Sequence, residues 1–143
     1  MLDAYRAMRA ANPATRLVLV GDGPLLGRLR RAGAGWIVAG RLVNGALSAH
    51  YASADTFLFP SVTETFGNVT LEAMASGLAV VAYDYAAARQ HIRHERSGLL
   101  APVGDREAFI QQARRLACDS DLARALGREA RATAAQIGWG AVI

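Results

Sequence analysis

Short apolar runs alternate along the chain with segments of helical character. Residues 2–11 have a helical composition that stops at Asn12-Pro13, because proline disfavours helical geometry in the residue before it. Five apolar runs are too short for helices and predict strands, at 17–20, 36–39, 56–59, 79–82 and 98–101. The segments between them predict helices at 46–53 and 67–76. Two amphipathic helices follow, the second from about residue 122; the first has an apolar face formed by Phe109, Ile110, Ala113, Leu116 and Ala117.

Three residues indicate where predicted helices begin and end. Pro24 suits the first position of a helix after the strand 17–20, because its missing N–H would be unpaired there in any residue. Asn44 is expected to cap the helix 46–53. Gly77 is the expected end of the helix 67–76, since glycine readily adopts the left-handed conformation found there.

The predicted strands together indicate a doubly wound α/β fold of the Rossmann-like kind. A sheet with one face in water would alternate apolar and polar residues, whereas these runs do not, so we expect a parallel sheet covered on both faces. Ligands of such sheets bind beyond the carboxyl ends of the strands. We therefore expect function in the loops after Val20, Ala39, Phe59 and Ala82.

Composition places the chain among globular proteins. Its 143 residues are 52% hydrophobic and 20% charged, which fits one domain over residues 1–143. No apolar run approaches the ~20 residues of a membrane helix, and residues 1–3 lack the layout of a secretion signal, so we expect a cytoplasmic protein. Cys118 is the one cysteine, which excludes an intramolecular disulfide; we expect it to face the core.

The charge is positive, with sixteen basic residues, all arginine, against twelve acidic ones. The arginines are spread over predicted helices, as expected of solvated helix faces. Nucleic-acid binding is not expected, because only 7% of the residues are aromatic and most of these lie in apolar runs. The positive balance leaves open an association with the inner face of an anionic membrane.

The loop after residues 17–20 has spaced glycines, Gly21, Gly23 and Gly27. This pattern is close to a dinucleotide fingerprint, and Arg41 would suit the phosphate of NADP. However, the third glycine is one place late, and residues 36–40 offer no acidic side chain for a ribose. We interpret the glycines as a tight turn between strand and helix.

The loop after residues 56–59 carries the most informative pattern, because it leads into a helix that opens at Gly67. A helix N-terminus has unpaired N–H groups and about half a positive charge, so the backbone of Gly67, Asn68 and Val69 suits a diphosphate. Glu72 lies one helical turn beyond Asn68, where its carboxylate can accept hydrogen bonds from both ribose hydroxyls. Glu64 precedes the helix and can accept from sugar hydroxyls.

Glu72 also has a structural interpretation, since its helix is apolar almost all round and a buried carboxylate needs a task or a partner. The histidines, His50, His91 and His94, show no arrangement typical of metal ligands, and no metal site is expected. His50 shares a helical face with Leu47 and Tyr51 and is expected to pack rather than to catalyse.

Four stretches combine into one pattern: Ala54-Asp55-Thr56-Phe57-Leu58-Phe59-Pro60-Ser61, Glu64-x-Phe66-Gly67, the Glu64-x7-Glu72 pair, and Leu71-Glu72-Ala73-Met74-Ala75-Ser76-Gly77-Leu78-Ala79-Val80-Val81-Ala82. Together they resemble the nucleotide-sugar domain of the family-four retaining glycosyltransferases, over about residues 17–116. The resemblance implies the C-terminal half of the two-domain GT-B architecture. It also implies transfer of a hexosyl group from a nucleotide diphosphate sugar to an acceptor, with retention of anomeric configuration and without a metal or other cofactor.

The resemblance assigns roles to individual residues. It implies that Glu64 is the catalytic residue that contacts the donor sugar and that Glu72 holds the ribose. The nucleotide sugar would also be bound by Thr65, Phe66, Gly67, Asn68 and Val69, with Gly40 and Leu42 touching the base.

Family members also have an N-terminal domain for the acceptor, which is a lipid, a glycan or a small molecule. Their donor domain opens with a strand and a loop that bears an arginine and a lysine. We expect this chain to be an N-terminally truncated donor domain that is inactive by itself. Without that strand, residues 17–20 and 56–59 lack a neighbour, so we expect self-association or direct pairing of these two strands.

Two other functions stay open. One is a non-catalytic fragment that binds nucleotide sugars, and the other is a sugar-nucleotide epimerase of the same architecture. The sequence does not distinguish UDP, GDP and ADP as the nucleotide carrier.

Overall fold

The computed structural model describes residues 1–33, 35–63 and 68–137. Strands and helices alternate along most of the chain, as the apolar runs predict. Their bounds are α1 (Leu2–Ala11), β1 (Leu17–Val20), α2 (Leu26–Ala32), β2 (Trp36–Gly40), α3 (Asn44–Ser53), β3 (Thr56–Phe59), α4 (Asn68–Ala75), β4 (Ala79–Tyr83), α5 (Ala86–His91), β5 (Leu99–Ala101), α6 (Arg106–Cys118) and α7 (Ser120–Gln136).

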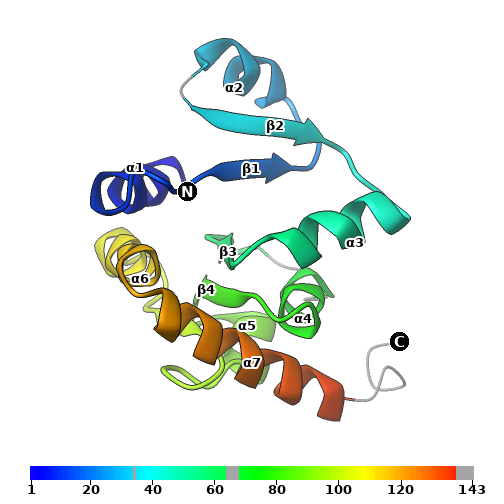
Figure 1. The fold of residues 1–143 in the computed structure, drawn as a ribbon, viewed down its shortest axis with the longest axis vertical. Coiled ribbons are helices and arrows are strands. Elements are labelled where there is room, and N and C mark those ends of the chain that lie inside the picture. The colour runs from blue at the N-terminus through cyan, green and yellow to red at the C-terminus, as the bar shows by residue number, and fades with distance from the viewer. Residues whose placement is uncertain (34, 64–67, 138–143) are drawn as a thin grey trace.

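The described strands form two parallel sheets rather than one. β1 pairs with β2, and the second sheet has the order β3-β4-β5. In Figure 1 the two sheets lie one above the other, with β1 and β3 as the strands that face each other across the gap. The break between the sheets thus lies between residues 17–20 and 56–59, the two strands expected to lack a neighbour. The alternative expectation, direct pairing of these two strands, is wrong for the described residues. β1 and β3 each have one edge whose backbone N–H and C=O groups pair with no other described strand.

The three-stranded sheet is the centre of the core and is covered on both faces. Its middle strand β4 is buried from Ala79 to Ala82. Alternate residues point to opposite faces, so Ala79 and Val81 pack with α1, α6 and the first half of α7, while Val80 and Ala82 pack with α4, α5 and the end of α7.

The two-stranded sheet is less well covered. Val18, Val20 and Ile37 are 41%, 43% and 56% exposed. The prediction that the strands would be buried on both faces is therefore wrong for β1 and β2. Burial on both faces needs an element packed over each face of the sheet, and the face that carries Val18, Val20 and Ile37 is left exposed.

Helix α1 lies against both sheets. Ala4 and Met8 belong to the core shared with α6, and α1 and α6 lie side by side in Figure 1. On the other side, the Tyr5 hydroxyl donates to the Gly35 carbonyl at 2.9 Å, and its ring meets Trp36 edge to face. The amide of Asn12 donates to the Ala117 carbonyl at 3.1 Å. These contacts fix the β1–β2 unit relative to the main core.

Helix α7 approaches the turn after α4 very closely. Gly77 ends α4 with φ of +82°, as predicted for the helix stop. A β-carbon at Gly127 of α7 would lie 2.1 Å from the Gly77 carbonyl oxygen. The absence of a side chain at Gly127 therefore allows the backbone of α7 to pack onto this turn. This contact holds the C-terminal end of α4 in place.

Several local expectations are corrected by the structure. Pro24 lies in a turn, and α2 begins two residues later at Leu26. Asn44 is the first residue of α3 rather than its cap, which is Val43. Cys118 is exposed, not turned to the core, because it lies two residues beyond buried Leu116 and so on the opposite helical face. His50 is also exposed, with Nδ1 2.8 Å from the Ala46 carbonyl oxygen.

Candidate functional site

Helix α4 presents its N-terminus beyond the carboxyl end of β3. Asn68 and Val69 at this end are exposed, whereas Thr70 and Leu71 are buried. The unpaired N–H groups of a helix start can bind an anion where they reach the surface. The structure therefore places two of the predicted phosphate-binding residues, Asn68 and Val69, where a ligand can reach them. Thr65, Phe66 and Gly67, which were also predicted to bind the nucleotide sugar, and Glu64, predicted to contact the donor sugar, lie outside the described residues.

The position of this helix start is fixed by the burial of the rest of α4. Ala73 and Met74 are fully buried against β4 and α7. At the other end, the Gly77 N–H donates to the Met74 carbonyl at 2.9 Å and the Leu78 N–H to the Ala73 carbonyl at 3.1 Å. These bonds satisfy carbonyls at the end of the helix. An anion site at its N-terminus would thus be held by a rigid element.

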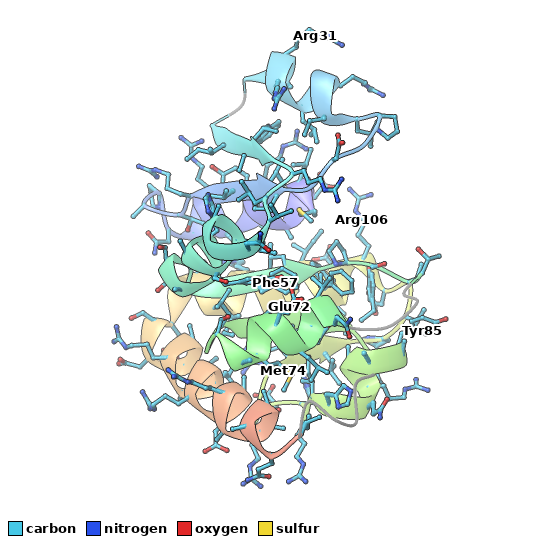
Figure 2. The ribbon with its side chains drawn as sticks, turned by 90° about the vertical axis from the view of Figure 1, so that its right-hand side faces the viewer. Arg31, Phe57, Glu72, Met74, Tyr85 and Arg106 are labelled. Atoms are coloured by element: carbon cyan, nitrogen blue, oxygen red, sulfur yellow. The ribbon has the colours of Figure 1, made fainter. Side chains whose placement is uncertain are left out.

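Glu72 is half-buried on α4 and has a hydrogen-bond partner from another helix. The hydroxyl of Tyr51, on α3, donates to Glu72 Oε2 at 3.3 Å. Figure 2 places Glu72 on the side of α4 that is turned towards α3 and Phe57. Tyr51 supplies the partner that this carboxylate was expected to need. A carboxylate offers about four acceptor positions, and one phenol uses one of them.

Tyr51 is the site residue that sequence reasoning missed. Its ring packs on Phe57 with centroids 6.0 Å apart, and Phe57 stacks on Phe59 at 5.8 Å. Burial, together with the nearby Glu72 carboxylate and its hydrogen bond, raises the pKa of Tyr51 to about 12. The sequence contained an indication of this role. Tyr51 lies four residues after Leu47 and so on the same helical face, where its ring can pack and its hydroxyl needs a hydrogen-bond partner.

The two candidates for base contact lie on the other sheet. Gly40 ends β2 and is buried, and Leu42 is half-buried in the connection to α3. The Gly40 carbonyl accepts from the Gly21 N–H at 2.8 Å, which ties the carboxyl ends of β1 and β2 together. Among the described residues, Gly40 and Leu42 form no hydrogen bond with Glu72. Their role in binding a base stays a prediction.

The glycine-rich turn after β1 borders a pocket of about 340 Å³. Gly21 has φ of +138°, a conformation that glycine adopts without strain. The Asp22 carboxylate accepts from the Gly23 N–H at 2.8 Å and so closes the turn. The pocket is lined by Leu19, Val20, Leu25 and Leu29 together with this turn. These contacts agree with the interpretation of the glycines as a strand-to-helix turn.

Two kinds of feature are absent from the described ranges 1–33, 35–63 and 68–137. No group of three or more His, Cys, Asp and Glu side chains is arranged to hold a metal ion. No helix among these residues has both the length and the apolar character needed to cross a membrane.

The chain matches a known family over most of its length. The family described as Glycosyl transferases group 1 matches residues 1–119. The GDP-mannose-dependent alpha-mannosyltransferase of Mycobacterium tuberculosis (strain CDC 1551 / Oshkosh) is 44% identical over 104 residues, which are 73% of this chain and 28% of that protein. Sulfoquinovosyl transferase SQD2 of Arabidopsis thaliana is 33% identical over 143 residues, which cover 96% of this chain and 28% of the relative.

A solved structure supports the fold. The C-terminal domain of the group 1 family protein LpcC from Francisella tularensis superposes with a TM-score of 0.80 at 22% identity, over 94% of this chain and 75% of that one. This likeness shows the fold. The chain thus spans just over a quarter of the length of the two relatives above and three quarters of a solved C-terminal domain.

Proposed function

We propose a function from one established premise, which is that the chain belongs to the group 1 glycosyl transferases. In our proposal it binds a nucleotide diphosphate sugar and serves as the donor-binding part of a longer enzyme. That enzyme would transfer the sugar to an acceptor with retention of anomeric configuration. The observation that carries the proposal is the exposed N-terminus of α4, followed one turn later by the half-buried carboxylate of Glu72.

The proposed donor would lie along the first turns of α4. The N–H groups near Asn68 and Val69 would receive the diphosphate, and Glu72 would accept hydrogen bonds from the ribose hydroxyls. Thr65, Phe66 and Gly67 would complete the diphosphate site, and Gly40 and Leu42 the base site. GDP-mannose is the first donor to test, because it is the donor named for the relative that is 44% identical.

Catalysis in the proposed enzyme depends on charge that builds up on the leaving diphosphate. The positive end of α4 lies where it would stabilise that charge, and Glu64 would position the donor sugar. We propose that no metal ion or other cofactor takes part, and that this chain by itself is inactive, because the acceptor would bind to a further domain. Addition of a chelator should then leave transfer unchanged.

The acceptor domain and the place of action are also proposals. The net charge of +4 suits a peripheral position at the inner face of an anionic membrane, where the acceptor would be a lipid. A glycan or a small-molecule acceptor would need no such position. Flotation of the chain with anionic and neutral vesicles distinguishes these two arrangements.

We expect a nucleoside diphosphate to bind at the N-terminus of α4 in this chain, and to bind weakly. A helix start supplies hydrogen bonds and a partial charge, but the chain has no lysine. We estimate a Kd of about 1 mM, or about 4 kcal/mol. Titration with UDP and separately with GDP, followed by NMR, should shift the amide signals of residues 67–69. Signals that stay still there while others move would contradict the proposed site.

We expect self-association through the open edges of β1 and β3, because an unpaired apolar strand can pair with another chain. Light scattering over a range of concentrations should show species larger than a monomer. Val18→Lys would place a charge beside the β1 edge and should reduce association. Val103→Lys is the matched control, since Val103 is similarly exposed, at 51% against 41%, but lies beyond β5. A monomer at all concentrations would contradict this expectation.

A further inference from the structure

The hydrogen bond between Tyr51 and Glu72 joins two helices that hold different parts of the proposed donor site. Tyr51 lies in the last turn of α3, and the connection that carries Leu42 leads into the start of the same helix. Glu72 lies on α4, whose N-terminus would receive the diphosphate. Among the described residues, this bond of 3.3 Å is the hydrogen bond that links α3 to α4.

The Tyr51 hydroxyl is held in place by its ring. The ring is half-buried, lies 6.0 Å from that of Phe57, and is packed against the core of α4 and β4. Phe57 is fixed in turn, because its strand is paired with β4 and its ring stacks on Phe59. A tyrosine has two side-chain torsions, so packing of the ring leaves the hydroxyl little freedom. The donor to Glu72 Oε2 is therefore preorganised.

The Tyr51 hydroxyl of the folded protein also stays protonated near neutral pH. Burial and the adjacent carboxylate raise the pKa of Tyr51 to about 12, so the phenol donates and does not repel Glu72. The Glu72 side chain has three torsions of its own and would move among rotamers on a helix surface. The fixed hydroxyl of Tyr51 therefore favours one orientation of the Glu72 carboxylate.

We infer that Tyr51 is a positioning residue, which orients the Glu72 carboxylate for the ribose of the donor and couples α3 to α4. This inference rests on the proposed function, in which Glu72 accepts from the ribose hydroxyls. The phenol occupies one acceptor position of Oε2, so the remaining positions of the carboxylate suit the two hydroxyls of a ribose. Tyr51 does not touch the nucleotide; it acts through Glu72.

The test uses the 143-residue chain and its variants Tyr51→Phe, Glu72→Gln and the double variant. Tyr51→Phe keeps the ring and its packing but removes the hydroxyl. We expect Tyr51→Phe to raise the Kd for UDP and GDP, measured by NMR, about threefold to tenfold, which is the value of one hydrogen bond. In the Glu72→Gln background the same change should have almost no effect, because the carboxylate that it orients is gone.

Tyr5→Phe is the matched control for a general loss of structure. It also removes a tyrosine hydroxyl that donates a hydrogen bond, here to the Gly35 carbonyl at 2.9 Å, but in α1 and away from α4. We expect it to lower the Tm and to leave both Kd values unchanged. A merely structural role for Tyr51 would give the same result as Tyr5→Phe, with a lower Tm and unchanged nucleotide affinity, and would overturn the inference.

The outcomes separate this inference from the proposed function. If Glu72→Gln weakens nucleotide binding and Tyr51→Phe does not, the inference fails and the proposed function stands. If Tyr51→Phe weakens binding equally with and without the Glu72→Gln change, Tyr51 acts by another route and the inference also fails. If Glu72→Gln leaves the Kd unchanged, the ribose is not held by Glu72, and the proposed function fails together with the inference.

Discussion

Replacement of Gly127 by alanine is expected to lower the free energy of unfolding by about 2–3 kcal/mol, the upper part of the range for overpacked sites. The added β-carbon would lie 2.1 Å from the Gly77 carbonyl oxygen and 3.1 Å from its carbonyl carbon. Both are backbone atoms, so no side chain can move aside to make room. Relief requires a shift of α7, which packs on α4 and β4. Urea unfolding followed by circular dichroism measures the change.

The matched control is Gly45→Ala in α3. A β-carbon added at Gly45 would have no neighbouring atom within 4 Å, and Gly45 is exposed. The same substitution there should stabilise the protein by about 0.5–1 kcal/mol, because alanine is the better helix former. The two variants thus share one chemical change and differ in the sign of its effect. A gain at Gly127 equal to that at Gly45 would mean that α7 does not pack on the Gly77 turn.

Most of the elements could be predicted from the sequence, because the apolar runs of β1, β3 and β4 are short and bounded by turn residues. The place of the break between β1 and β3 does not follow from the apolar runs, because the hydrophobic pattern of a strand does not specify its neighbours. It was expected only from the strand that the family resemblance implies between residues 17–20 and 56–59. The short helix α5 was also missed. Its six residues, AAARQH, have no apolar repeat, and its first residue, Ala86, has φ of +45°.

The errors at Cys118 and His50 have a common origin in helical phase. Leu116 is buried in α6, and Cys118 lies about 200° further around the helix axis. In α3, the residues on the packed side are Leu47 and Tyr51, four apart, which leaves His50 about 100° away from that stripe. For α6 the apolar face that contains Leu116 was already identified from the sequence, and the expectation for Cys118 was wrong because it rested on residue type instead of helical phase.

The candidate site was predictable where one element forms it. The exposed start of α4, its buried body and the place of Glu72 one turn along follow from a single apolar helix after a glycine. The family and the fold class were also correctly predicted. Tyr51 was not, because its contact with Glu72 depends on how α3 docks onto α4, which is set by the packing of Phe57 and the tertiary fold.

The paired glutamates give the second large effect, in the complete enzyme that we propose. Glu72→Ala should weaken nucleoside diphosphate binding itself by about 1.5–3 kcal/mol, the value of hydrogen bonds to a charged acceptor. Removal of the carboxylate also leaves the Tyr51 hydroxyl without the acceptor that it has in the structure. Calorimetry with UDP and GDP measures the loss. The Tm of each variant shows whether the fold is retained.

Glu64→Gln should behave differently, because Glu64 precedes the helix start whereas Glu72 lies one turn beyond it. A carboxylate that holds the donor sugar does not touch a nucleotide that carries no sugar. The variant should therefore keep its affinity for nucleoside diphosphate and lose turnover of the nucleotide sugar. Equal losses of nucleoside diphosphate affinity in the two variants would contradict the assignment. A stability loss in both, without discrimination between nucleotide and nucleotide sugar, would instead indicate that the two carboxylates serve the fold.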